Sequence, residues 1–167
     1  MLRFLIILVF FAVLPALNGV AANRYWVGGD GTWNDTNHWS GAAGGAGGTN
    51  VPATGDYVYV TNSVGDIVVS YTNTANPAIS NLLIQGLSGA SVTITQSQDY
   101  LTVAGSACIA SNAGARATFV QTGGTNIFCT NASPTTFVIA YDANATGVYH
   151  LVDGFLASAG DYGGFAV

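Results

Sequence analysis

The sequence predicts an all-β fold: a right-handed single-stranded parallel β-helix (β-solenoid) with an N-terminal cap. Half of the residues are hydrophobic and 22 of 167 are glycine, a composition that favours short strands joined by tight turns. No segment after the N-terminus has a sustained helical period, and strand-like runs recur about every 8–12 residues. These runs are 57–60, 66–69, 81–84, 91–94, 100–103, 117–120, 126–128, 136–139 and 148–151.

Internal repetition favours a solenoid over a compact β-sandwich, which remains the alternative if the repetition is chance. Residues 109–124 align with residues 139–154 at an offset of 30. A unit of this length with about three short strands predicts one coil of a β-helix, with about five coils in all. The identical pairs are Ile109/Ile139, Ala110/Ala140, Ala113/Ala143, Ala115/Ala145 and Gly124/Gly154.

Residues 1–22 have the pattern of a secretory signal peptide. Arg3 precedes an apolar run at 4–14, and small residues at 20–22 form a cleavage context. The apolar run is shorter than the roughly 20 residues that span a bilayer, so no membrane-spanning segment is expected in the mature chain. The protein is therefore expected to be exported, to the extracellular space or the bacterial cell surface.

The mature chain divides into two expected parts. Residues 23–61 hold a cap and a glycine-rich loop at 41–48, flexible by composition, and residues 62–167 hold the coils. All three tryptophans lie in the first part, where they are predicted to cover the open end of the core. The alternative is an aromatic platform for sugars. Residues 161–167 look like the start of another coil, which predicts coils continuing beyond the chain end. The tryptophans are Trp26, Trp33 and Trp39.

The scarcity of basic residues excludes two classes of binding partner, nucleic acids and anionic membrane surfaces. The chain has no lysine and no glutamate, and Arg24 and Arg116 are the only cations after the predicted signal, against eight aspartates. A nucleic-acid-binding protein needs a basic surface that neutralises phosphates, so no nucleic acid is expected. Anionic membrane surfaces are unsuited for the same reason.

The stretch YWVGGDGTWNDTNHWS at 25–40, followed by Pro52 and Gly55-Asp56, resembles the mature start of bacterial exported β-helix repeat proteins. That group includes autotransporter passenger-like and PEP-CTERM-type surface proteins. His38 stands where the group usually has asparagine. The segments ATFVQTGGTN at 117–126 and FVIAYDANATGVYHLVDGFLAS at 137–158 are similar to the group's repeats. The resemblance implies an exported β-helix, of which this chain would be an N-terminal fragment, and assigns no catalytic residue.

Metal binding is not expected. The segment GGDGTWND at 28–35 is similar to a calcium-binding glycine-aspartate roll, but Trp33 stands where that roll has aspartate. Calcium needs six to eight oxygen ligands, which Asp30 and Asp35 alone do not supply. Both are expected to close tight turns. His38 and His150 are far apart, zinc would need more ligands, and His150 is expected to face solvent.

Catalysis is not expected either. A glycosidase needs a pair of carboxylates, whereas the aspartates are scattered, and a lyase needs a cationic group, for which only Arg116 remains. No nucleophile motif accompanies the histidines. No catalytic, cofactor-binding or metal-binding residue is therefore predicted, and no cofactor. The scattered carboxylates are Asp56, Asp66, Asp99, Asp142, Asp153 and Asp161.

Two cysteines occur in a chain that is expected to be exported. Cys108 and Cys129 could form a disulfide in an oxidising compartment. In the 30-residue alignment, however, Cys108 falls on Val138 and Cys129 on Ala159, which favours two small buried side chains. Sequons for glycosylation begin at Asn34, Asn131 and Asn144, and an Asn/Thr-rich chain produces such matches by accident.

The function expected from these features is structural. The chain would be an exported surface or secreted repeat protein that presents polar strand faces and loops for adhesion or matrix contact, without catalysis. Its expected partners are extracellular glycans or other surface proteins. The alternative is a carbohydrate-binding or carbohydrate-active β-helix of the lyase or hydrolase type.

Overall fold

The computed structural model describes residues 20–131 and 135–159, and its regular structure there is almost entirely β. The exception is one 3-10 turn, η1 (Thr36–His38). No helix in the described part is long and apolar enough to cross a membrane. The strands are β1 (Asn23–Trp26), β2 (Gly31–Thr32), β3 (Trp39–Ser40), β4 (Tyr57–Asn62), β5 (Ile67–Tyr71), β6 (Ala78–Ile79), β7 (Asn81–Gly86), β8 (Val92–Gln96), β9 (Tyr100–Val103), β10 (Ala107–Ile109), β11 (Arg116–Phe128), β12 (Phe137–Ile139) and β13 (Thr146–Ser158).

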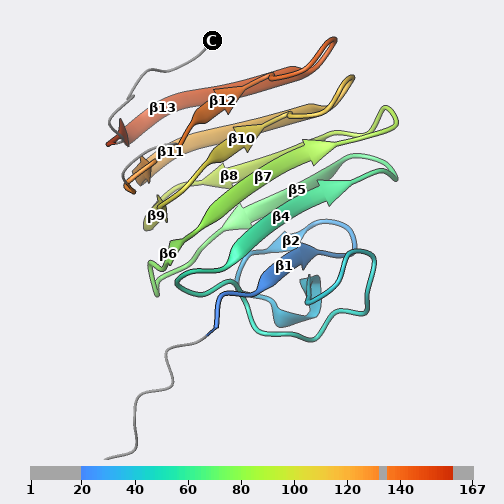
Figure 1. Ribbon diagram of the computed structural model, residues 1–167, viewed down its shortest axis with the longest axis horizontal. Helices are drawn as coiled ribbons and strands as arrows, with labels where there is room; N and C mark the ends of the chain where they lie inside the picture. The colour runs from blue at the N-terminus through green and yellow to red at the C-terminus, as the bar shows by residue number, and fades with distance from the viewer. Residues whose placement is uncertain (1–19, 132–134, 160–167) are drawn as a thin grey trace, which may run out of the picture.

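Most neighbouring strands run parallel. One series is β1, β4, β7, β10 and β12, and a second is β2, β5, β8, β11 and β13. β9 pairs with β6 and with the second half of β11. β1 and β2 lie at one end of the molecule and β12 and β13 at the other (Figure 1).

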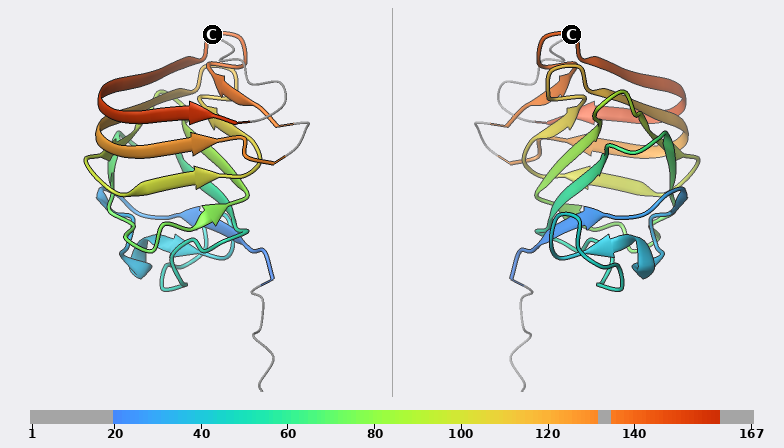
Figure 2. Two further views of the ribbon diagram at one scale, coloured as in Figure 1. Left: turned by 90° about the vertical axis from the view of Figure 1, so that its left-hand side faces the viewer. Right: turned by 90° about the vertical axis from the view of Figure 1, so that its right-hand side faces the viewer.

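The predicted regular right-handed parallel β-helix is wrong. The strands belong to one 13-stranded sheet of mixed direction that curls around the core as a half-barrel (Figure 2). β1 and β3 are antiparallel, with Tyr25 opposite Ser40, and an antiparallel contact between Arg116 and Gly86 joins β11 to β7. Because β11 runs unbroken for 13 residues, it pairs with both β8 and β9 and links what would otherwise be separate parallel stacks.

The spacing between paired strands also departs from a single repeat. Pairs in the middle of the sheet are offset by 24 or 25 residues, whereas β11 and β13 are offset by 30, with Arg116 opposite Thr146. The additional residues lie in one connection. Three residues, 104–106, join β9 to β10, and eight residues, 129–136, join β11 to β12. The 30-residue alignment therefore describes only the last pairs of strands.

The strand assignments from sequence hold well. Each of the nine predicted runs lies in or overlaps a strand, and the runs 117–120 and 126–128 merge into β11. Cys108 pairs with Val138 and Ile109 with Ile139, as the alignment predicts. The short strands β1, β2, β3, β6 and β10 were not predicted.

The core lies inside the curl and follows from alternation along the strands. In β8, Val92, Ile94 and Gln96 are buried and the two threonines between them are half-buried, as expected for one apolar face. The two ends of the molecule differ. Trp33 and Trp39 are fully buried at the β1–β3 end, whereas Val152 and Phe155 of β13 are 58% and 57% exposed.

Candidate functional site

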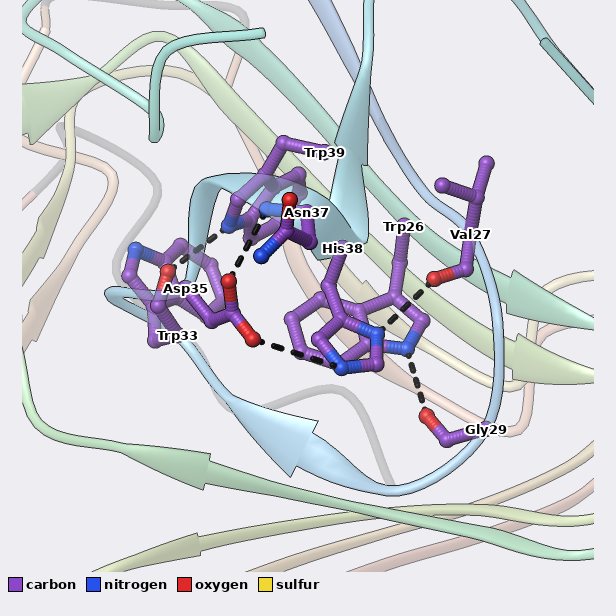
Figure 3. A network of polar contacts seen from close by, with 8 residues as sticks. All are labelled: Trp26, Val27, Gly29, Trp33, Asp35, Asn37, His38 and Trp39. Carbon is purple, nitrogen blue, oxygen red and sulfur yellow. Dashed lines mark hydrogen bonds and ion pairs between the residues drawn. The ribbon is translucent and has the colours of Figure 1, made fainter. Parts of the chain in front are cut away.

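The segment 25–40 is built around its three tryptophans (Figure 3). Trp39 packs edge-on against both Trp26 and Trp33, with ring centroids 5.2 Å and 4.9 Å away. The indole Nε1 of Trp39 donates to the carbonyl oxygen of Trp33 at 2.7 Å, and that of Trp26 donates to Gly29 at 3.1 Å. Trp33 and Trp39 are 0% exposed and Trp26 is 4% exposed. A sugar-stacking platform needs an exposed ring face, which these buried rings do not offer.

His38 is part of the same packing. Its ring stacks on Trp26 at 4.6 Å, and its Nδ1 donates to the carbonyl oxygen of Val27 at 2.9 Å. Its Nε2 lies 3.7 Å from Asp35 Oδ2, an ion pair when the imidazole is protonated. A Cβ on Gly31 would come within 2.6 Å of that Nε2, so a glycine is required beneath the ring. His38 therefore serves as a packed aromatic side chain.

Of the two aspartates in this segment, Asp35 closes a turn, as predicted, whereas Asp30 binds a neighbouring strand. Asp35 caps η1 and accepts a hydrogen bond from the Asn37 N–H at 2.9 Å. Asp30 accepts from the Val68 N–H of β5 at 2.7 Å. Within residues 20–131 and 135–159, no group of three or more His, Cys, Asp or Glu side chains is placed to hold a metal ion.

Most of the other aspartates also bind backbone N–H groups. Asp66 accepts from Ser91, and Asp142 and Asp153 each accept from the residue that follows. Asp56, 3% exposed, pairs with Arg24 at 2.9 Å and also accepts from two backbone N–H groups. Asp99 differs, because its buried Oδ2 has no partner within the described residues. Asp161 lies outside the described part of the chain.

The remaining candidates are separate from one another. His150 is exposed on β13, as predicted, and Asn34 and Asn144 are exposed at two of the sequons. Cys108 and Cys129 are both free thiols; Cys129 is buried, but Cys108 is only half-buried. Burial raises the pKa of the Cys108 thiol, which works against the reactive thiolate.

One face of the sheet presents side chains in register. On the face formed by β2, β5, β8, β11 and β13, two outer columns carry small, β-branched or polar groups. We call them the outer columns, and they consist of Thr32, Ser70, Thr95, Val120 and His150, and of Val68, Thr93, Thr118 and Val148. Successive members stand about 4.8 Å apart, the spacing of neighbouring strands.

The most site-like feature is a groove that the sequence did not reveal. Tyr25 of β1 stacks on Tyr59 of β4, with ring centroids 4.7 Å apart and planes 11° apart. Beside Tyr25 lies a groove of about 450 Å³, which we call the Tyr25 groove, open to solvent. Its walls include the loop residues 43–45, the end of β4 at 61–62 and Ser63 of the following turn. The alternation Tyr25-x-Val27 beside the glycine-rich loop was the only available sign of it.

A second cavity of about 480 Å³ lies between residues 50–54 and 73–77. Asn73, 2% exposed, borders it, and its side-chain Nδ2 has no partner within the described part of the chain. Its Oδ1 accepts from the Ala75 N–H and closes a turn. No aromatic ring of the described residues borders this cavity, so it offers fewer specific contacts than the Tyr25 groove.

Comparisons of the chain with known protein families, with curated proteins and with solved structures returned no match. The function is therefore argued from the fold and from the surfaces described above.

Proposed function

We propose that the protein is an exported bacterial surface or secreted protein that acts as a non-catalytic scaffold for adhesion or matrix contact. The first 22 residues support export, and the segment 25–40 supports membership in the autotransporter passenger-like or PEP-CTERM-type group that it resembles. The rigid part of the scaffold is the curled sheet. Its contacts are made by the outer side chains and loops.

The observation that carries this proposal is the pair of outer columns. Their nine side chains repeat in register across five strands and include one ionisable group, His150. A regular, nearly uncharged surface suits repeated weak contacts with an extended partner. The binding of most aspartates to backbone N–H groups further supports a structural role for the carboxylates.

Export and adhesion can be tested with the same protein. Expressed with residues 1–22 in a bacterial host, the chain is expected outside the cytoplasm with Asn23 as its first residue, as read by N-terminal sequencing. Beads coated with the exported protein are expected to adhere to surfaces coated with mucin, collagen or cellulose. An unprocessed cytoplasmic product, or beads that adhere no better than albumin-coated beads, would overturn the proposal.

The outer columns are tested by substitution. Thr95→Asp with Thr118→Asp places two charges in the middle of the columns, and adhesion is expected to fall at least several-fold. The matched control is Thr54→Asp, at an exposed position outside the columns. If both variants adhere equally well, the outer columns do not take part in adhesion.

A further inference from the structure

We propose that the partner contacted by this scaffold includes a neutral glycan, and that the Tyr25 groove binds it. This inference rests on the proposed contact function and names the chemical class of the partner. The groove of about 450 Å³ falls within the range of roughly 300–1,000 Å³ that is usual for small-molecule sites.

The lining of the groove selects for a neutral, hydroxyl-rich ligand. The aromatic ring of Tyr25 and the side chain of Leu87 supply apolar surface, and Thr61 and Ser63 supply hydroxyl groups. Among the residues that the structure describes, no Asp, Arg or His borders the groove. A charged peptide or a nucleic acid would lose its hydration there without gaining an ion pair. A sugar ring has an apolar C–H face and a rim of hydroxyls, which matches one aromatic wall and a polar edge.

The aromatic wall is held in place before a ligand arrives. Tyr59 stacks on one face of the Tyr25 ring, and Tyr25 also borders the groove. Both tyrosines belong to paired strands, where Tyr25 stands opposite Tyr59. A ring fixed in this way loses little conformational freedom when a ligand stacks on it.

Another part of the groove wall is a loop held by hydrogen bonds. Its residues 43–45 were expected to be flexible, yet Gly45 donates to the Ala42 carbonyl oxygen at 3.0 Å, and Ala42 donates to Ser40 Oγ at 3.2 Å. A Cβ on Gly45 would come within 2.5 Å of Ser40 Oγ, and one on Gly47 within 1.8 Å of the Asn37 carbonyl oxygen. The glycines thus allow the loop to pack closely on the segment 36–40, and the groove is preformed.

Ligand binding in the groove can be followed by the fluorescence of Trp26. Trp26 borders it and is 4% exposed, so a ligand in the groove changes the surroundings of one of the three indoles. We would titrate the purified protein with cellohexaose, xylohexaose, chitohexaose and maltohexaose, following tryptophan fluorescence and calorimetry. Oligogalacturonate serves as the acidic comparison. At least one neutral hexasaccharide is expected to bind saturably, and more tightly than oligogalacturonate.

Substitutions locate the binding. Tyr25→Ala is expected to weaken binding about tenfold through loss of the stacking surface, whereas Tyr25→Phe keeps the ring and is expected to remain within about threefold. Since Tyr25→Ala could also loosen β1, a second variant fills the groove from outside. Ser63→Trp, in the exposed β4–β5 turn, is expected to abolish binding without a change in the melting temperature.

The matched control is Val64→Trp, one residue further along the turn. Val64 is 84% exposed and does not border the groove, so binding should be unchanged. The inference is overturned if no neutral hexasaccharide binds, if acidic oligomers bind best, or if Ser63→Trp and Val64→Trp bind equally.

The bead assay separates the two proposals. If coated beads adhere to collagen or mucin but no hexasaccharide binds, the glycan inference fails and the scaffold function stands. If beads adhere to none of the three surfaces, the scaffold function fails, whatever the titration shows.

Discussion

The two fully buried tryptophans differ in one hydrogen bond. Trp39 donates its indole N–H to the Trp33 carbonyl oxygen, whereas the indole N–H of Trp33 has no partner within residues 20–131 and 135–159. Both rings pack edge-on in the same cluster. Replacing each tryptophan by phenylalanine therefore measures how much this hydrogen bond contributes to the free energy of unfolding.

Trp39→Phe is expected to destabilise the protein by about 1–3 kcal/mol more than Trp33→Phe does, because it leaves a buried carbonyl oxygen unpaired. Trp33→Phe removes a donor that is already unpaired and loses packing alone. Urea unfolding followed by far-ultraviolet circular dichroism measures both free energies. Equal losses would show that the Trp39 bond contributes nothing.

Ala140 has a backbone conformation that suits glycine. It is exposed and has φ 58°, a left-handed conformation that costs an L-residue roughly 1–2 kcal/mol. Ala140→Gly is therefore expected to raise the free energy of unfolding by up to about 1 kcal/mol. Ala143→Gly, at an exposed neighbour outside the set of positive φ angles, is the control and should lower it slightly. A loss of stability in Ala140→Gly would contradict the assignment.

At the scale of single elements, β13 is the least protected strand. It pairs with β11 along one side, and no described strand pairs with its other side. Val152 and Phe155 on it are more than half exposed, and no lysine or proline interrupts it. Such an edge offers unpaired backbone groups and apolar surface to another strand.

The purified chain is expected to self-associate through β13 as its concentration rises. Val152→Lys with Phe155→Lys should lower the weight-average mass in sedimentation velocity, because like charges would meet at the pairing edge. Val64→Lys, on the distant β4–β5 turn, should leave it unchanged. A wild-type protein that stays monomeric at the highest attainable concentration would exclude this contact.

The elements show where prediction from sequence succeeds. Alternation of apolar residues located β4, β5, β7, β8 and β9 well, because each buries one face of a strand. Two-residue strands such as β2 and β6 contain too few positions for any period. The Tyr25 groove was missed because it depends on contacts between residues far apart in the chain, such as Tyr25 with Tyr59 and Gly45 with Ser40.

For the whole molecule, the sequence predicted the all-β class but not the single mixed sheet. The 30-residue offset was read from the one pair of segments where it holds. The 25-residue offset has equal identity in the sequence, with Ile84/Ile109, Gly89/Gly114, Ala90/Ala115, Thr93/Thr118 and Gln96/Gln121 identical, but it was not recognised. The antiparallel pairing of β3 with β1 depends on the loops around the tryptophans. Neither feature follows from local periodicity.

Stability of the whole molecule should fall at high pH. Burial raises the pKa of Tyr149 to about 12, although a hydrogen bond from Asn126 opposes this, and burial also raises the pKa of Tyr71. Below pH 10, the ordinary tyrosine value, this contribution is fully present. Above it the unfolded chain ionises first, and the contribution is lost as pH rises through the folded pKa.

The urea midpoint is therefore expected to be nearly constant from pH 8 to 9.5 and to fall between about pH 10 and 12, with Tyr149 contributing about 2–3 kcal/mol to the loss. Tyr149→Phe should show a shallower fall over the same range. A midpoint that does not change up to pH 12 would contradict the raised pKa values.

The long connection at 129–136 has a consequence for how this molecule can vary. It is five residues longer than the connection at 104–106, yet β11 and β13 stay paired along their length on either side of Gly124. The chain thus has five more residues in this connection while the pairing of β11 with β13 is kept. A peptide inserted beside Asn131, which is exposed, is expected to leave the pairing of β11 with β13 in place. Insertions that arise during evolution are expected to be tolerated in this same connection. The surface that meets a partner can then change while the sheet that supports it stays the same.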